Sequence, residues 1–228
     1  MYQQDFILRM IRQFTQVILQ LAGLRQSGKL AAAEILLQET YLDLFGLTST
    51  LLFHLPEDEL IRRVCLGDDD DPKRIRMLAE LLKVEGDLHA DQARDFDAHH
   101  RWLKSLALFI HAWRLAPEEA AAEIFESIHR LDESLQTTGL SGETQADLFF
   151  YYQESNHLDR ALASLQTFSH RSSNPLQARS LAEAFCQDLL LKTDEELVQG
   201  GVTRQQVETA LGGFGPAPSE AANRPNPL

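Results

Sequence analysis

Histidine and aspartate side chains gather between residues 87 and 111, and they are the residues in the sequence best suited to bind a metal ion. Asp91, Asp95 and His99 are four residues apart, so one face of a helix could present all three to the same ion. The segment has neither the His-Glu-x-x-His pair of metalloproteases nor the Glu-x-x-His repeats of carboxylate-bridged metal bundles. We therefore predict no metal site, and keep a metal-dependent enzyme using this cluster as an alternative.

Four consecutive aspartates, Asp68 to Asp71, are a second group of potential ligands. A calcium loop needs alternating ligands, a central glycine and a distal glutamate, and this spacing is absent here. Asp71 precedes Pro72, and a helix often starts with an acidic cap followed by proline. The sequence predicts that Asp71 caps a helix beginning at Pro72.

The two cysteines, Cys65 and Cys186, stand among apolar residues, which is typical of small core side chains rather than of nucleophiles. No Gly-x-Ser-x-Gly turn occurs, and no glycine-rich loop precedes a lysine. We predict no catalytic residue and no cofactor, and the sequence favours a non-enzymatic protein.

The charge balance bears on the class of partner. The chain has 228 residues, with 21 Lys and Arg against 34 Asp and Glu, a net charge of −13. This disfavours nucleic acid and anionic membranes as partners. No stretch approaches the roughly 18 apolar residues of a membrane span. Charged residues interrupt the N-terminal apolar positions, which disfavours a secretory signal. The presence of only two cysteines suits a reducing compartment. We expect a cytoplasmic protein.

The charge is also unevenly distributed along the chain. Residues 1–31 contain four basic and one acidic residue, a net charge of +3, whereas residues 118–133 contain one basic and six acidic residues, a net charge of −5. An acidic body with a basic first helix is suited to bind basic peptides or to self-associate.

Apolar residues recur three and four positions apart along most of the chain, which predicts helices, and strand patterns are nearly absent. Ser27 and Gly28 should end the first helix. In that helix an alternating three-four seam could pair two copies of the chain as a homodimer; it comprises Ile7, Met10, Phe14, Val17, Leu21 and Leu24. The predicted helices after it cover residues 29–44, 56–66, 72–88, 94–115, 117–135, 143–154, 158–169, 175–190 and 203–211. Thr48 or Ser49 should cap a short turn that reaches Leu55.

Residues 143–175 form a series of large, turn and small residues that resembles one tetratricopeptide-type unit of about 34 residues. Its positions are Leu148, Phe149, Tyr152, Asn156, Ala161, Leu165, Phe168 and Pro175. Half of a second unit is formed by Ser105, Phe109, Ala112 and Pro117. The opening segment, residues 1–11, is similar to a family of uncharacterised bacterial helical proteins with tetratricopeptide-like C-terminal halves. That resemblance implies a fold and no particular activity.

These observations predict an all-α protein of about 9 to 11 helices, in which antiparallel pairs stack as a tetratricopeptide-like right-handed α-solenoid. An irregular α-bundle is the alternative fold. The helical domain should span residues 1–211, with N-terminal helices in 1–66 and helix pairs in 72–211. Residues 212–228 should be a flexible tail rich in glycine and proline.

Stacked helix pairs form extended surfaces that recognise proteins or peptides, so we expect a protein- or peptide-binding scaffold. The predicted partner-binding residues lie near the turn of the tetratricopeptide-like unit and should be exposed; they are Tyr151, Asn156, His157 and Arg160. A self-associating structural protein is the second functional hypothesis.

Overall fold

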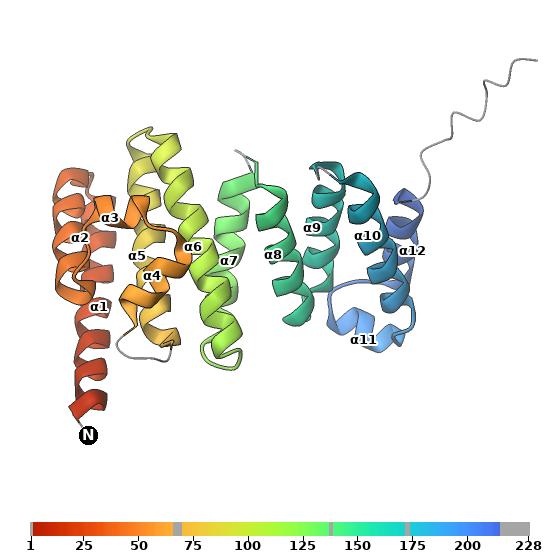
Figure 1. Cartoon of the computed structure of the whole chain (residues 1–228), viewed down its shortest axis with the longest axis horizontal. Coiled ribbons are helices and arrows are strands. Elements are labelled where there is room, and N and C mark those ends of the chain that lie inside the picture. The colour runs from red at the N-terminus through yellow and green to blue at the C-terminus, as the bar shows by residue number, and fades with distance from the viewer. Residues whose placement is uncertain (1, 66–69, 137–138, 172–173, 215–228) are drawn as a thin grey trace, which may run out of the picture. The chain divides into compact units, whose positions relative to one another are not determined.

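The computed structural model describes residues 2–65, 70–136, 139–171 and 174–214. Within these ranges every regular element is an α-helix and no strand occurs, which confirms the all-α prediction. The chain divides into two compact units, residues 1–139 and 140–228 (Figure 1). The predicted division between residues 66 and 72 falls inside the first unit, where α2 (Leu30–Phe45) and α4 (Glu57–Val64) both pack on α5 (Pro72–Asp91).

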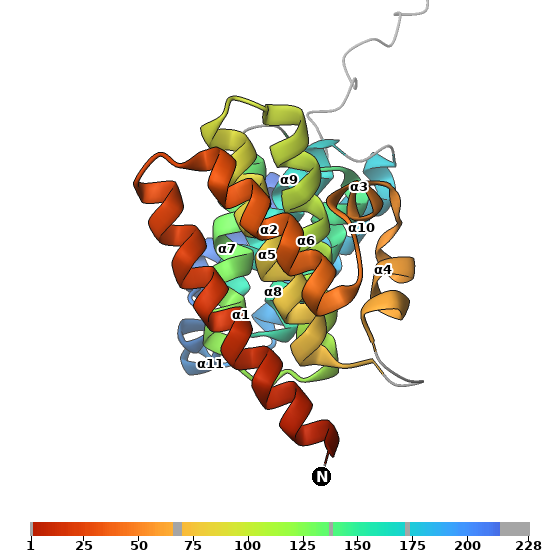
Figure 2. The same cartoon turned by 90° about the vertical axis from the view of Figure 1, so that its left-hand side faces the viewer.

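The first unit contains seven of the twelve helices in the described ranges. In chain order they are α1 (Tyr2–Gln26), α2 (Leu30–Phe45), α3 (Ser49–His54), α4 (Glu57–Val64), α5 (Pro72–Asp91), α6 (Asp95–Leu115) and α7 (Ala121–Gln136). Helices α5 and α6 make the most extensive contact of any pair, and α1 and α2 form a second hairpin beside them (Figure 2). None of the helices in the described ranges has the length and apolar content needed to cross a membrane.

The close approach of α5 and α6 depends on Gly86. A Cβ atom at this position would lie only 2.5 Å from Cδ1 of Trp102 on α6. The indole nitrogen of Trp102 donates a hydrogen bond to Asp87 Oδ1 at 3.0 Å. Glycine at position 86 therefore lets the large indole ring lie directly on the backbone of α5.

Predicted helix ends are confirmed at two positions. Gly28 follows α1 with a φ of 70°, the left-handed conformation that glycine adopts readily. Asp71 caps α5, because its Oδ1 accepts hydrogen bonds from the backbone N–H groups of Lys73 and Arg74 at 3.0 and 3.3 Å, and Pro72 begins the helix. Asp68 and Asp69 lie outside the described residues.

The buried guanidinium of Arg74 joins three N-terminal helices. Its Nε donates to the carbonyl oxygen of Val64 at 2.7 Å, and its Nη2 donates to that of Leu44 at 3.3 Å. These carbonyls belong to the last turns of α4 and α2, where carbonyl groups lack partners within the helix and the helix dipole is negative. Burial lowers the pKa of Arg74. One side chain of α5 thus fixes the ends of two preceding helices.

The second unit contains α8 (Gly142–Glu154), α9 (Leu158–Arg171), α10 (Pro175–Leu190), α11 (Asp194–Gln199) and α12 (Arg204–Gly213). Helices α8 and α9 form its main hairpin, and α10 packs on both α9 and α12. Its core includes aromatic residues of α8 and α10, and the rings of Phe149 and Phe185 meet edge to face with centroids 5.0 Å apart.

Three sequence-based expectations about the helices were wrong. Helix α7 begins at Ala121 rather than Pro117, because residues 117–120 form a turn in which Ala120 has a φ of 55°. The six-residue helix α11 was not expected; it is held by a capping box between Thr193 and Glu196. Together with α3, it brings the number of described helices to twelve, above the predicted range.

The predicted tail starts too early at residue 212. Helix α12 continues to Gly213, and Phe214 is buried at its end. Residues 215–228 lie outside the described residues.

Candidate functional site

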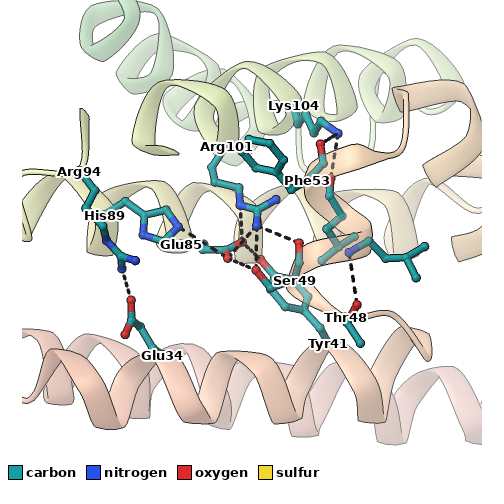
Figure 3. A network of polar contacts seen from close by, with 12 residues as sticks. Glu34, Tyr41, Thr48, Ser49, Phe53, Glu85, His89, Arg94, Arg101 and Lys104 are labelled. Atoms are coloured by element: carbon teal, nitrogen blue, oxygen red, sulfur yellow. Dashed lines mark hydrogen bonds and ion pairs between the residues drawn. The ribbon is translucent and has the colours of Figure 1, made fainter. Parts of the chain in front are cut away.

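A polar network is buried between α2, α3, α5 and α6 in the first unit (Figure 3). Glu85 and Arg101 form its central ion pair, with Arg101 Nε 2.9 Å from Glu85 Oε2 and side chains only 7% and 4% exposed. The carboxylate also accepts hydrogen bonds from the hydroxyls of Tyr41 at 3.0 Å and Ser49 at 2.6 Å. Because the charged groups bind one another, the network carries a balanced pair rather than an isolated charge.

Burial shapes the ionisation of the residues around this pair. It raises the pKa of Tyr41 well above its usual value and lowers that of His89, whose Nε2 lies 3.8 Å from Glu85 Oε1. Both side chains are therefore uncharged at neutral pH. Acid–base chemistry needs groups within reach of a substrate, whereas these groups face one another between packed helices. The arrangement is suited to fixing α2 and α3 against α5 and α6.

Lys104, one turn after Arg101 on α6, completes this polar region. Its ammonium group donates to the backbone carbonyl oxygens of Leu52 and Phe53 at 2.8 Å each, and also to that of Leu55. These carbonyls lie at the end of α3, so the lysine caps that helix and complements its dipole. Burial lowers the pKa of Lys104. A cation engaged by three carbonyls is structural here.

An apolar groove of about 480 Å³ opens in the same unit between α1 and α7. Its volume lies within the ~300–1,000 Å³ typical of ligand sites. Its apolar lining comes mostly from α1, with additions from α5, α6 and α7: Ile11, Phe14, Ile18, Leu19, Met77, Phe109 and Ile124. Since this surface combines a hollow with a mainly apolar lining, it is our candidate binding site.

Helix α1 lines the groove because its apolar face is wider than the part that α2 and α5 cover. Met10, Val17 and Leu21 are buried where α1 packs on α2 and α5. The neighbouring face, with Phe14 and Ile18, is half-buried and lines the groove, and Leu19 at its edge is 69% exposed. The predicted apolar seam is thus divided between the core and the groove; the side chain of Ile7 lies outside the described residues.

The rim of the groove is charged, with acids on α7. Basic residues of α5 reach across to acids at the start of α7: Lys73 Nζ lies 3.0 Å from Glu119 Oε1, and Arg76 Nη1 lies 3.3 Å from Glu123 Oε2. Glu123 is nevertheless 80% exposed. Glu126, one turn further on at the rim, pairs with Arg130 on the same helix at 2.9 Å and is 56% exposed. The side of the groove formed by α7 therefore presents carboxylates.

The predicted partner-binding residues lie in the second unit, around the turn between α8 and α9. Asn156 is exposed with a φ of 59°, His157 is half-buried with its Nδ1 3.0 Å from Ser155 Oγ, and Arg160 is half-exposed. The expectation that Tyr151 is exposed was wrong: it is only 1% exposed and contacts the ring of Tyr152. Its place three residues after Leu148, a core residue, already puts it on the buried face of α8.

Two aspartates of the possible metal cluster, Asp87 and Asp91, form ion pairs with another helix. The guanidinium of Arg25 at the end of α1 pairs with Asp87 at 2.7 Å and with Asp91, and its hydrogen bond lowers the pKa of Asp91. Across the described parts of the chain, no three His, Cys, Asp or Glu side chains are grouped to hold a metal ion. The cysteines are buried as expected.

The sequence does not predict the groove itself, although it contains two of the signals for it. These signals are the broad apolar stripe of the basic first helix, which ends at Gln26, and the acidic segment that begins at residue 118. No known family model matches the chain, and no curated protein or solved structure matches it either.

Proposed function

We propose that the chain is a non-enzymatic protein-interaction scaffold, and that the groove between α1 and α7 takes an amphipathic helix of a partner protein. The observation that carries this proposal is the 480 Å³ apolar groove with its acidic rim on α7. Such grooves hold partner helices by their apolar faces. Because Glu123 and Glu126 stand at the rim, the polar side of the partner helix should carry lysine or arginine.

The order of the helices supports a tetratricopeptide-like arrangement for this surface. Helices α1 and α5 are the first members of two successive hairpins, and together with α7 they supply all of the lining except Phe109 of α6. In stacked helix pairs the corresponding helices form the extended concave binding surface. We therefore propose a right-handed tetratricopeptide-like solenoid acting in the cytoplasm.

The turn between α8 and α9 is proposed as a separate polar contact site for a partner. Asn156, His157 and Arg160 all reach the surface there and offer amide, imidazole and guanidinium groups for hydrogen bonding. Tyr151 is excluded from direct contact with a partner because it is buried.

Binding of a model peptide tests the proposed groove. The probe is a fluorescent amphipathic helix with leucine on one face and lysine on the other, and the matched peptide carries glutamate in place of lysine. Measured by fluorescence anisotropy with the full chain, the lysine peptide should bind at least about tenfold more tightly. Failure of the lysine peptide to bind, or equal binding of both peptides, would overturn the proposal.

A pair of substitutions on α1 locates the binding. Thr15 is exposed and lines the groove, so Thr15→Arg should weaken binding of the lysine peptide by about tenfold through repulsion and obstruction. Gln16→Arg adds the same charge at the next residue, which is exposed and lies outside the groove. This control should bind like the unmodified chain, and equal losses in both variants would contradict a groove site.

A further inference from the structure

The outer edge of α1 combines an exposed apolar side chain with exposed basic residues. Leu19 stands at the edge of the groove, and Arg12 precedes it by seven residues, about two helical turns, so the two share one edge of the helix. Arg9 is also exposed. α1 has 25 residues against 16 in α2, and its N-terminal part extends past the end of α2 (Figure 2). This edge of α1 is therefore available to a partner.

We propose that the helix bound in the groove is α1 of a second copy of the chain, so that the protein forms a two-fold dimer. This inference rests on the proposed function, since it names the partner of the same groove. A two-fold interface places the same patch on both copies, so that patch must contain both complementary parts. Here the apolar edge at Leu19 and the groove beside it belong to one surface, because α1 lines the groove.

The charges of the two parts are complementary. Arg9 and Arg12 belong to the segment 1–31 with its net charge of +3, whereas Glu123 and Glu126 belong to the segment 118–133 with −5. When α1 of one copy covers the groove of the other, its arginines face the acidic rim on α7. The same contact is repeated by the symmetry axis, which doubles its contribution. The apolar part is covered at the same time, since Leu19 and Phe14 of each copy lose their exposure to water.

The oligomeric state of the full chain tests this inference by light scattering coupled to size exclusion and by sedimentation velocity, from low to high micromolar concentration. The unmodified chain should show a concentration-dependent dimer. Leu19→Asp should weaken dimerisation at least about tenfold, because it places a carboxylate against an apolar surface and an acidic rim. Leu191→Asp is the matched control, since Leu191 is also an exposed leucine but lies in the second unit. It should dimerise normally.

A charge-exchange experiment identifies the contact more specifically. Arg12→Glu alone and Glu123→Arg/Glu126→Arg alone should each be monomeric, because like charges then face each other at both copies of the contact. An equimolar mixture should form a heterodimer, since Glu at position 12 of one chain meets Arg at 123 and 126 of the other, while the reciprocal contact keeps its native charges. These residues are exposed at the surface, so circular dichroism should show unchanged helix content.

The outcomes separate this inference from the proposed function. A chain that stays monomeric at all concentrations, or a dimer that survives both Leu19→Asp and the charge reversals, overturns the second copy as occupant. In either case, binding of the lysine peptide that is blocked by Thr15→Arg would still support the proposed function. The inference is supported if Leu19→Asp loses the dimer and if the two charge variants, each monomeric alone, form a heterodimer when mixed.

Discussion

Glu85 and Arg101 face each other across the α5–α6 hairpin and bind through two pairs of atoms. Arg101 Nε lies 2.9 Å from Glu85 Oε2, and Arg101 Nη2 donates to Oε1 at 3.1 Å. The same Nη2 also donates to the carbonyl and the hydroxyl of Ser49 at 2.9 and 2.7 Å. One guanidinium therefore ties α6 both to α5 and to the first residue of α3.

Removing one partner of this buried pair should be strongly destabilising. In Glu85→Leu the guanidinium of Arg101 stays buried without its carboxylate, and we expect the free energy of unfolding in urea to fall by about 3–5 kcal/mol. The double variant Glu85→Leu/Arg101→Met removes both charges and should lose less than the single variant. A double variant less stable than Glu85→Leu would show that Arg101 stabilises the fold even without Glu85, through its bonds to Ser49.

The capping of α3 by Lys104 predicts a second effect on stability. Lys104→Met keeps most of the side-chain volume but leaves three carbonyl groups at the end of α3 without their donor, so we expect a loss of about 1–3 kcal/mol in urea unfolding. Lys192→Met, at an exposed lysine of the second unit, should change the stability little. If both variants unfold at the same urea concentration, the buried lysine does not stabilise the fold through these bonds.

Two glycines within helices should respond oppositely to alanine. Gly86→Ala puts a Cβ 2.5 Å from the indole of Trp102 and should cost about 1–3 kcal/mol, because the packed ring must shift. Gly23→Ala on α1 has no atom within 4 Å of the new Cβ and should stabilise the chain by about 0.5–1 kcal/mol through helix propensity. Thermal unfolding followed by circular dichroism measures both changes. A neutral Gly86→Ala would mean that α5 and α6 can separate without cost.

Helical periodicity was sufficient to predict the long helices. The spacing of leucines, the cap at Asp71 and the glycine at position 28 are local signals, and each lies within a few residues of the helix end that it predicts. Helix α11 has no periodic signal because six residues are too few for one, and its capping box is the local feature that marks it. The start of α7 was misplaced because proline also occurs in turns, as Pro117 does.

The candidate site required the three-dimensional arrangement. Arg74, Arg101 and Lys104 belong to a residue class usually found at the surface, yet all three are buried because helix ends from α2, α3 and α4 meet them. The groove likewise joins α1 to α7, and no local pattern relates two helices so far apart in sequence. The sequence indicates the two sides of the groove separately, as an apolar basic helix (α1) and an acidic segment (α7). Only the fold, which places these two helices side by side, forms the groove.

The buried imidazole of His89 predicts how stability depends on pH. Burial lowers the pKa of His89 in the folded chain, and Arg94 and Arg101 lower it further, while Glu85 and Asp97 oppose them. Below about pH 6.5 the unfolded chain binds a proton that the folded chain does not yet bind, so stability falls as the pH drops from there towards the folded pKa. Within this pH window one such group lowers the free energy of unfolding by at most about 1.4 kcal/mol per pH unit.

His99, His100 and His157 have pKa values lowered by burial as well, so the unmodified chain should lose stability in acid through several groups. His89→Gln removes one of them while keeping a polar side chain beside Glu85. We expect its urea midpoint to fall less between pH 7.5 and pH 5.5 than that of the unmodified chain, and the two curves to run parallel above neutral pH, where His89 is uncharged in both states. If the variant instead keeps the full acid sensitivity, His89 binds its proton equally well in the folded and unfolded chain, and its burial carries no cost in acid.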